Sequence, residues 1–278
     1  MPDTEILVEG VAFPECPRWH EGVLWWSDHA LGRVYRLNGD PQIVLEIAEQ
    51  PSGLGWRPDG TLLVVSMLDR RLLAWDGQKL SQVADLTGVF PWHANDMVVD
   101  AAGRAYVGNF GFDLGGGEVT STVLACVDPD GTIAVAAEDL LFPNGAVITP
   151  DGKTLIVAET YGARLTAFDI GAGGEVANRR EWSPTPGVFP DGICLDAEGC
   201  VWVASVTTGE AIRYREGGEI AGRIKSSRDN AFACMLGGED GRTLFVCTAS
   251  GSSYEESREL LGGRIETARV EAPHAGLP

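Results

Sequence analysis

The fold is decided by the stretch Phe142-Pro143-Asn144-Gly145-Ala146-Val147-Ile148, followed by Pro150-Asp151-Gly152, because the chain repeats this pattern. A second copy reads Phe189-Pro190-Asp191-Gly192-Ile193-Cys194-Leu195, followed by Ala197-Glu198-Gly199. Weaker copies begin near Phe13, Pro51 and Trp92. Repetition at a period of tens of residues indicates one supersecondary unit that is used several times.

Each unit has the same order of segments. A short apolar strand is followed by a turn centred on Asp-Gly or an equivalent pair, then by a second strand rich in Val, Leu and Ile, and then by a third strand. No stretch of roughly 10 to 12 residues has a convincing helical period. The predicted second strands are Thr61–Ser66, Arg104–Asn109, Thr154–Glu159, Cys200–Ser205 and Thr243–Thr248.

Six such units fit the chain, the last beginning near Asn230. Several antiparallel strands per unit at this period are typical of a β-propeller blade, so we expect an all-β, six-bladed propeller that forms one domain over residues 1–278. The strand Thr4–Glu9 has no unit of its own. We expect it to join the last blade beside Arg264–Val270 and close the ring, which removes an exposed edge. An open sandwich of the same strands is the alternative, and the regular repeat disfavours it.

The composition of the chain limits the classes of partner and the cellular compartment that we expect. The net charge of -19 argues against nucleic acid and anionic membranes as partners. Met1–Gly10 has no apolar segment of the signal-peptide kind, and no run of about 18 apolar residues suggests a membrane span. Six cysteines without a Cys-x-x-Cys pair favour buried free thiols in the cytoplasm, with a Cys194–Cys200 disulfide as the alternative. The oligomeric state is not indicated.

Two insertions interrupt the repeat. They span residues 110–122, which include Gly115-Gly116-Gly117, and residues 250–263. Long loops in compact folds are often lids over a functional site, but they are also tolerated as surface insertions, and both interpretations remain open here.

Four polar residues occupy equivalent places at the start of the first strand in blades one, three, four and five. They are Glu15, Asn95, Asn144 and Asp191. Because the first strand of a blade lines the central channel, we expect these side chains to gather at one mouth of it. Two carboxylates and two amide carbonyls suit Ca²⁺, Mg²⁺ or Mn²⁺, whereas Zn²⁺ would lack its usual nitrogen and sulfur ligands.

A purely structural interpretation of these residues is also possible. Asn-Gly and Asp-Gly are common hairpin-turn dipeptides, so Asn144-Gly145 and Asp191-Gly192 can be turns. However, a further Asp-Gly or Glu-Gly pair follows each of them seven residues later and already supplies the hairpin turn. The first pair therefore marks the entrance of a strand, where the backbone does not require a polar side chain.

Several motifs together resemble the senescence-marker-protein/gluconolactonase family, to which regucalcin and the luciferin-regenerating enzyme belong. They are Phe13-Pro14-Glu15-Cys16-Pro17-Arg18-Trp19, Asn95-Asp96 with Asp100–Gly108, Pro143-Asn144-Gly145 with Thr149–Gly152, and Phe189–Gly192. The resemblance covers nearly the whole chain. It implies a six-bladed propeller with one catalytic divalent cation, for which we expect Ca²⁺, with Mg²⁺, Mn²⁺ or Zn²⁺ as alternatives.

The resemblance also implies a reaction, the opening of a lactone ring, and roles for individual residues. It makes Glu15, Asn144 and Asp191 the metal ligands. Asn95 matches the residue that reaches the metal or the substrate, and Asp191 matches the position usually assigned as the general base.

One position departs from the family pattern. Sugar-lactone members commonly have Arg two residues before the match of Asn95, and this chain has His93. Arg is a permanent bidentate cation, whereas His is mostly neutral near neutral pH. We therefore expect a less polar lactone or ester than an aldonolactone, although His93 can also be a structural hydrogen-bond donor. The predicted substrate-binding residues are His93, Asn95, Trp92, Phe110, Phe112 and Trp26, and each aromatic ring among them can equally be core packing.

Other chemistries have little support. The chain has four His, no Gly-x-Ser-x-Gly elbow, no P-loop and no dinucleotide fingerprint. Three alternatives remain open. They are a metal-dependent ester or organophosphate hydrolase on the same site, as in diisopropylfluorophosphatase-like propellers, a non-catalytic metal- or ligand-binding propeller, and a protein-interaction scaffold.

Overall fold

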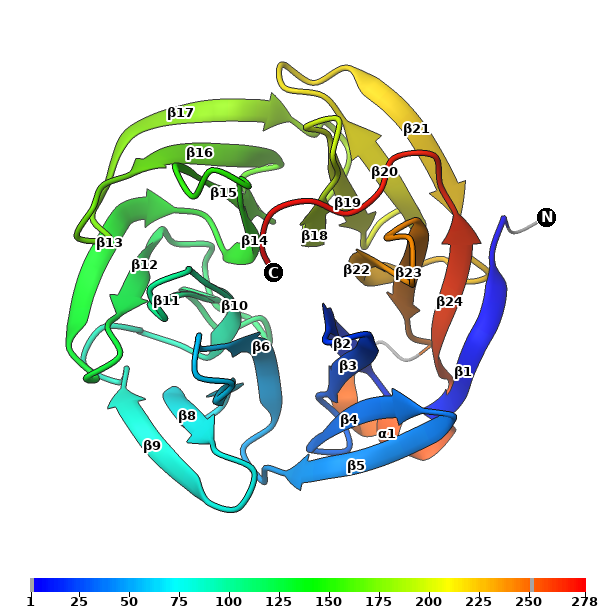
Figure 1. The fold of residues 1–278 in the computed structure, drawn as a ribbon, viewed down its shortest axis with the longest axis horizontal. Helices are drawn as coiled ribbons and strands as arrows, with labels where there is room; N and C mark the ends of the chain where they lie inside the picture. Colours follow the sequence, from blue (N-terminus) through cyan, green and yellow to red (C-terminus); the bar gives the residue numbers. More distant parts are fainter. Residues whose placement is uncertain (1–2, 251–252) are drawn as a thin grey trace.

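Six antiparallel four-stranded sheets surround one central channel in the computed structural model, which describes residues 3–250 and 253–278 (Figure 1). The predicted all-β, six-bladed propeller is confirmed. The innermost strand of every blade is its first strand, and it runs along the channel (Figure 1).

The first three blades follow the chain order from the channel outward. Blade one is β2 (Pro14–His20), β3 (Val23–Asp28), β4 (Arg33–Asn38) and β5 (Asp40–Glu46). Blade two is β6 (Pro51–Trp56), β7 (Leu62–Ser66), β8 (Arg71–Trp75) and β9 (Leu80–Asp85). Blade three is β10 (Ala94–Val99), β11 (Ala105–Asn109), β12 (Thr122–Val127) and β13 (Ile133–Leu140).

The last three blades complete the ring. Blade four is β14 (Pro143–Ile148), β15 (Thr154–Glu159), β16 (Arg164–Ile170) and β17 (Val176–Pro184). Blade five is β18 (Pro190–Leu195), β19 (Val201–Ser205), β20 (Glu210–Tyr214) and β21 (Ile220–Lys225). Blade six is β22 (Ala231–Gly237), β23 (Thr243–Thr248), β24 (Gly263–Arg269) and β1 (Glu5–Val11).

The N-terminal strand closes the ring as predicted. β1 pairs antiparallel with β24, with Glu5 opposite Thr267 and Val8 opposite Ile265. Neighbouring blades pack face to face through apolar side chains, for example Val147 of blade four with Ile193 and Val203 of blade five. Each blade is thus held by apolar burial on both faces.

Two kinds of glycine distinguish the turns from the strand entrances. Gly152 and Gly199 have φ of 71° and 75°, as the predicted hairpin turns require. In contrast, Gly145 lies inside β14. A Cβ at this position would be 2.6 Å from the Ile193 backbone nitrogen and 2.7 Å from the Asp191 backbone carbonyl oxygen. The inner strands therefore approach too closely for a side chain at this position, and the hairpin-turn interpretation of Asn144-Gly145 is wrong.

Different segments lie on the two faces of the ring (Figure 1). The helix α1 (Tyr254–Leu260) lies behind β4 and β5 in Figure 1, and its N-cap, Ser253, accepts a hydrogen bond from the Glu256 amide. At seven residues, α1 is too short to have given a helical period in the sequence. The C-terminal segment 271–278 crosses the opposite face, where Leu277 exchanges two backbone hydrogen bonds of 2.9 Å with Ile148.

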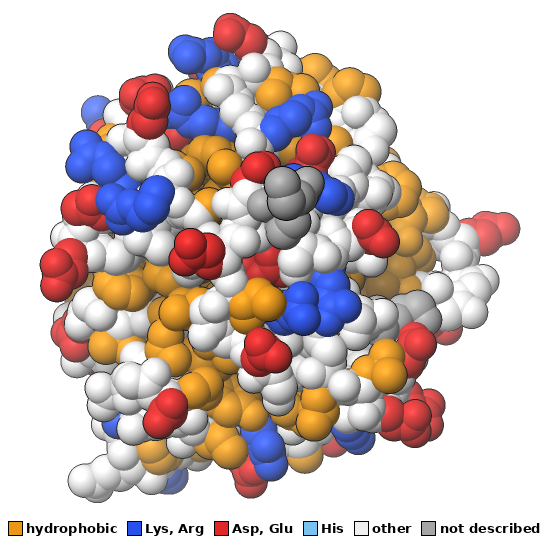
Figure 2. Space-filling view, turned by 90° about the vertical axis from the view of Figure 1, so that its right-hand side faces the viewer, with side chains coloured by type: hydrophobic (Ala, Val, Ile, Leu, Met, Phe, Trp, Pro, Cys, Tyr) orange, Lys and Arg blue, Asp and Glu red, His pale blue; other side chains and the backbone are white. Residues whose placement is uncertain are grey.

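Charged side chains lie on the surface of the ring (Figure 2), and the cysteines lie inside it. Acidic and basic side chains are interspersed over the side of the ring that Figure 2 shows. All six cysteines are free and buried. Among the described residues, no helix combines the length and the apolar character that a membrane span requires.

Candidate active site

A cavity of about 720 Å³ opens at the channel mouth where the inner strands begin. Glu15, Asn95, Asn144 and Asp191 all line it, from blades one, three, four and five. Each of them is buried, with an exposed fraction of 6% to 8%. The structure therefore brings together the four polar residues that the repeat placed at equivalent strand entrances.

A break in strand pairing positions each of these side chains. The register between the first and second strands shifts between Glu15 and Arg18, between Ala94 and Met97, between Pro143 and Ala146, and between Pro190 and Ile193. A local irregularity of this kind bends the strand and re-aims a side chain. The same irregularity occurs between Pro51 and Leu54 in blade two and between Ala231 and Ala233 in blade six. It is thus a feature of every blade, and in four of them the residue at this place is a carboxylate or an amide that lines the cavity.

The two carboxyl groups lie in an unfavourable environment for negative charge. The pKa of Glu15 is raised to about 8, chiefly by burial and also by the charge of Asp96, against the opposing effects of the hydrogen bond from the Cys16 amide and the charge of Arg18. Burial also raises the pKa of Asp191 well above its usual range, as does the nearby charge of Glu15, and Asn144 opposes this by hydrogen bonding. Two buried carboxylates that repel each other favour a bound cation.

Each of the two amides has one polar atom available for a bound group. Asn144 donates from Nδ2 to the Thr160 hydroxyl at 3.1 Å, and Thr160 donates to the Pro190 carbonyl at 2.8 Å. This chain of bonds orients the Asn144 amide and leaves its Oδ1 available. The Nδ2 of Asn95 is buried and has no hydrogen-bond partner, so Asn95 can donate to a ligand in the cavity.

These residues fit a hard divalent cation. Within the described part of the chain, no three His, Cys, Asp or Glu side chains form a metal-binding group, so a cation here depends on amide oxygens as well as on Glu15 and Asp191. Carboxylate and amide oxygens are ligands that Ca²⁺ and Mn²⁺ accept. None of the described residues that line the cavity is Lys or Arg. Arg18, whose charge lowers the pKa of Glu15, is outside this lining and is paired with Asp96.

A buried ion pair lies next to this site. Arg18 of β2 donates to Asp96 of β10 at 2.5 Å. It also donates to the carbonyl oxygens of Leu54 at 2.9 Å and Met97 at 2.9 Å. Arg18 therefore connects blades one, two and three, and its partner Asp96 directly follows Asn95.

The predicted substrate-binding residues differ in their positions. Asn95 and Phe110 line the cavity. Phe112 packs behind the wall, with its ring 6.0 Å from Phe142. His93 stacks on Trp92 at 5.0 Å and meets the edge of Phe110 at 5.6 Å, so His93 and Trp92 support the wall without lining it. Burial lowers the pKa of His93, which keeps it neutral.

Trp26 lies elsewhere in the molecule. It is fully buried in the core between blades and stacks on Tyr35 at 5.1 Å. Trp26 is in the second strand of blade one, β3, where the side chains face the neighbouring blades instead of the channel. The expectation that it forms part of the pocket wall is corrected.

Several wall residues were not anticipated. Phe13, Phe142 and Phe189 line the cavity, as do Tyr161, Phe232, Tyr254 and His29. The first three had a signal in the sequence, because each directly precedes Pro and then Glu15, Asn144 or Asp191. Leu114 and Gly115 from one insertion and Ser250, Ser253 and Tyr254 from the other also line the cavity, whereas residues 251–252 lie outside the described residues.

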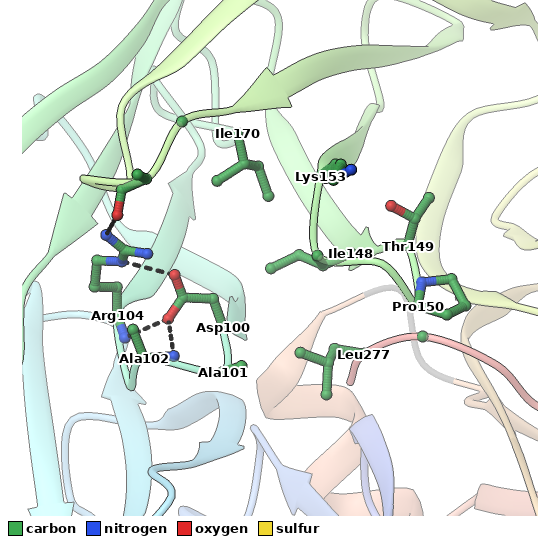
Figure 3. A pocket seen from close by; sticks show the side chains of 14 residues that line it. Asp100, Ala101, Ala102, Arg104, Ile148, Thr149, Pro150, Lys153, Ile170 and Leu277 are labelled. Carbon is green, nitrogen blue, oxygen red and sulfur yellow. Dashed lines mark hydrogen bonds and ion pairs between the residues drawn. The ribbon is translucent and has the colours of Figure 1, made fainter.

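A second cavity, of about 780 Å³, lies on the opposite face beside the C-terminal segment (Figure 3). Three charged side chains line it: Arg104 donates to Asp100 at 2.7 Å and to the Ala172 carbonyl at 3.2 Å, and Lys153 lies on the other side of the cavity (Figure 3). It has no group of polar side chains comparable to the four at the other mouth.

The fold and the cavity together define a six-bladed propeller with an acidic, amide-lined site at one channel mouth. The chain belongs to the SMP-30/gluconolactonase/LRE-like family, whose model matches residues 13–250. The resemblance recognised in the sequence is thereby confirmed.

Two relatives have names that describe an activity. A 6-deoxy-6-sulfogluconolactonase from Pseudomonas putida is 30% identical over 278 residues, covering 95% of this chain and 93% of the relative. A pentonolactonase from Haloferax volcanii is 29% identical over 265 residues, covering 90% and 86%.

Two solved structures have the same fold. A luciferin-regenerating enzyme superposes with a TM-score of 0.83 at 17% identity, covering 100% of this chain and 99% of that one. Regucalcin from Agrobacterium tumefaciens, described as a calcium-binding protein, superposes with a TM-score of 0.80 at 21% identity, covering 96% and 93%.

Proposed function

We propose that this protein is a divalent-cation-dependent hydrolase that opens a lactone ring. The observation that supports this best is the meeting of Glu15, Asn95, Asn144 and Asp191 in one buried cavity without Lys or Arg. Membership of the family and two relatives named as lactonases support the same reaction. Ca²⁺ is the proposed cation, because the donors are hard oxygens and a protein of the same fold is described as calcium-binding.

Glu15, Asn144 and Asp191 are the residues proposed to hold the cation through their side-chain oxygens. When bound, the cation supplies Lewis-acid chemistry, which polarises the lactone carbonyl and stabilises negative charge that develops on its oxygen. The pKa values of Glu15 and Asp191, which burial and neighbouring charges raise in the cation-free protein, would be lower beside a bound cation. Both carboxylates then stay ionised near neutral pH.

Asp191 is the proposed general base. It accepts a proton from the water that attacks the lactone carbonyl, a role that typically contributes a factor of about 10²–10⁴ to the rate. Asn95 orients the substrate, because its unpartnered Nδ2 donates a hydrogen bond into the cavity. The aromatic wall excludes bulk water, which strengthens these polar interactions.

The substrate is proposed to be less polar than an aldonolactone. Aromatic rings dominate the wall, and no guanidinium among the described lining residues offers bidentate bonds to sugar hydroxyls. His93, which replaces the arginine that is common in sugar-lactone members, is neutral and supports the wall from behind.

Metal removal and restoration test the proposed function. Protein treated with a chelator is expected to open no lactone, and addition of Ca²⁺ or Mn²⁺ is expected to restore turnover. The panel contains glucono-δ-lactone, unsubstituted aliphatic lactones, aryl lactones and a phosphotriester, each followed by acid release. Turnover that is insensitive to chelation, or phosphotriester cleavage faster than every lactone, would contradict the proposal.

A further inference from the structure

Four aromatic residues of the cavity wall are here called the aromatic collar: Phe13, Phe142, Tyr161 and Phe189. The three phenylalanines occupy the same place in the repeat, since each precedes a proline and then one proposed cation ligand. The repeat therefore places a phenyl ring close to each of the three proposed ligands.

The collar is continuous on one side of the opening. The ring centroids of Phe142 and Tyr161 are 5.5 Å apart, and those of Tyr161 and Phe189 are 5.6 Å apart with the rings nearly parallel at 24°. The fourth ring, Phe13, packs against Phe232, another lining residue, with the ring centroids 4.5 Å apart. These contacts fix the rings as flat surfaces on which another ring can stack.

The collar presents apolar surface to solvent. Phe189 is 42% exposed and Tyr161 is 37% exposed, although both line a cavity. Exposed aromatic surface of this kind, next to a polar centre, is typical of a ligand site, where a bound apolar group removes it from water. A volume of about 720 Å³ has room for a lactone ring together with a substituent.

The charges of the cavity disfavour an anionic substituent. Glu15 and Asp191 are the charged side chains in the described wall, and no Lys or Arg lines it. A sulfonate or carboxylate substituent held among the collar rings loses its water without gaining a Lys or Arg partner, and the proposed cation is already held by Glu15, Asn144 and Asp191.

Given the lactonase function proposed above, on which this step rests, we infer that the collar selects neutral lactones with an aromatic or extended apolar substituent and rejects lactones that bear a sulfonate or carboxylate. Phe189 is the specificity-determining residue that is most accessible to a test, because its ring is exposed and its removal leaves no cavity in the core.

Three lactones of matched skeleton provide the test with the cation-loaded protein: γ-butyrolactone, γ-phenyl-γ-butyrolactone and its para-carboxylate. The phenyl compound is expected to exceed γ-butyrolactone in kcat/KM by about tenfold, and the para-carboxylate is expected to fall about tenfold below the phenyl compound. The Phe189→Ala variant is expected to reduce the preference for phenyl by about threefold or more. Ile43→Ala, at a 49% exposed position on the outer strand β5, is the matched control and should change neither rate.

A phenyl preference near one in the wild type, or an unchanged preference in Phe189→Ala, would overturn the inference. Calorimetric binding of 5-phenyl-2-pyrrolidinone, an uncleaved lactam analogue, separates the two proposals. Lactone turnover without a preference for the phenyl compound would refute the inference about the collar and leave the lactonase proposal standing. If no lactone is turned over but the lactam binds and Phe189→Ala weakens that binding, the ligand class inferred for the collar is supported and the lactonase proposal is refuted.

Discussion

The Asp191→Asn variant is expected to lose about a thousandfold or more in kcat/KM while it retains its fold. The substitution preserves the size of the side chain but removes one of the two carboxylates that line the cavity. It thereby removes the proposed proton acceptor and one charged ligand of the cation. The rate is measured at saturating cation on the lactone that the wild type opens fastest.

The same variant is expected to melt at the same temperature as the cation-free wild type, or higher. Burial and the charge of Glu15 raise the pKa of Asp191 in the folded protein. The free energy of unfolding of the wild type therefore falls as the pH rises above the pKa that Asp191 has in the unfolded chain. A neutral amide has no such pH-dependent cost. Loss of activity together with unchanged or increased stability distinguishes a catalytic residue from a structural one.

Asp196 provides a matched control, because it directly follows the same inner strand but lies at the other face. It is buried and accepts a hydrogen bond from Arg213 at 2.7 Å. Asp196→Asn should therefore lower the melting temperature and leave kcat/KM within about twofold of the wild type. Asp191→Asn with more than about a tenth of the wild-type activity would contradict the general-base assignment.

The Arg18→Met variant is expected to lose about 3–5 kcal/mol in the free energy of unfolding. The side chains of Arg18 and Asp96 are 4% and 5% exposed, and Arg18 is bonded to carbonyls in blades two and three as well as to Asp96. Its removal leaves the buried Asp96 carboxylate with a hydrogen bond from the Met97 amide but without a cationic partner, which is far more costly than the loss of the pair itself. Urea denaturation measures the change.

The ion pair between Arg269 and Asp240 provides the control for this prediction. It has the same separation, 2.5 Å, but its side chains are 62% and 46% exposed. Arg269→Met should change the free energy of unfolding far less than Arg18→Met does, because solvent screens an exposed pair. Equal effects of the two substitutions would show that burial of the Arg18 pair does not determine its contribution.

The architecture was predictable from the sequence because the blade is a local unit. Asp151-Gly152 and Glu198-Gly199 specify hairpins, and the apolar segments beside them specify strands, so counting units was enough to predict the ring. The closure by β1 was predictable for the same reason, since Thr4–Glu9 had no partner within a unit of its own. The helix α1 was not predictable, because seven residues around Glu255 and Glu256 are too few to define an apolar face.

The site was predictable only where the repeat acts on it. Glu15, Asn95, Asn144 and Asp191 occupy equivalent positions, and equivalent positions meet at the channel mouth. Trp26 has no equivalent position of this kind, and its place in β3 turns it into the core between blades. Tyr254 comes from an insertion, whose path over the mouth depends on tertiary packing. The Phe-Pro pair before Glu15, Asn144 and Asp191 was visible in the sequence, but the structure was needed to show that the three Phe rings line the cavity.

Anomalous diffraction from crystals soaked in Mn²⁺ is the most direct test of the central claim, that separate blades aim their oxygens at one cation. The account predicts a single strong peak in the cavity, within about 2.0–2.6 Å of a carboxylate oxygen from Glu15, a carboxylate oxygen from Asp191 and the Oδ1 of Asn144. A map with no peak there, or with the ion bound only at acidic side chains on the outer surface, would contradict it.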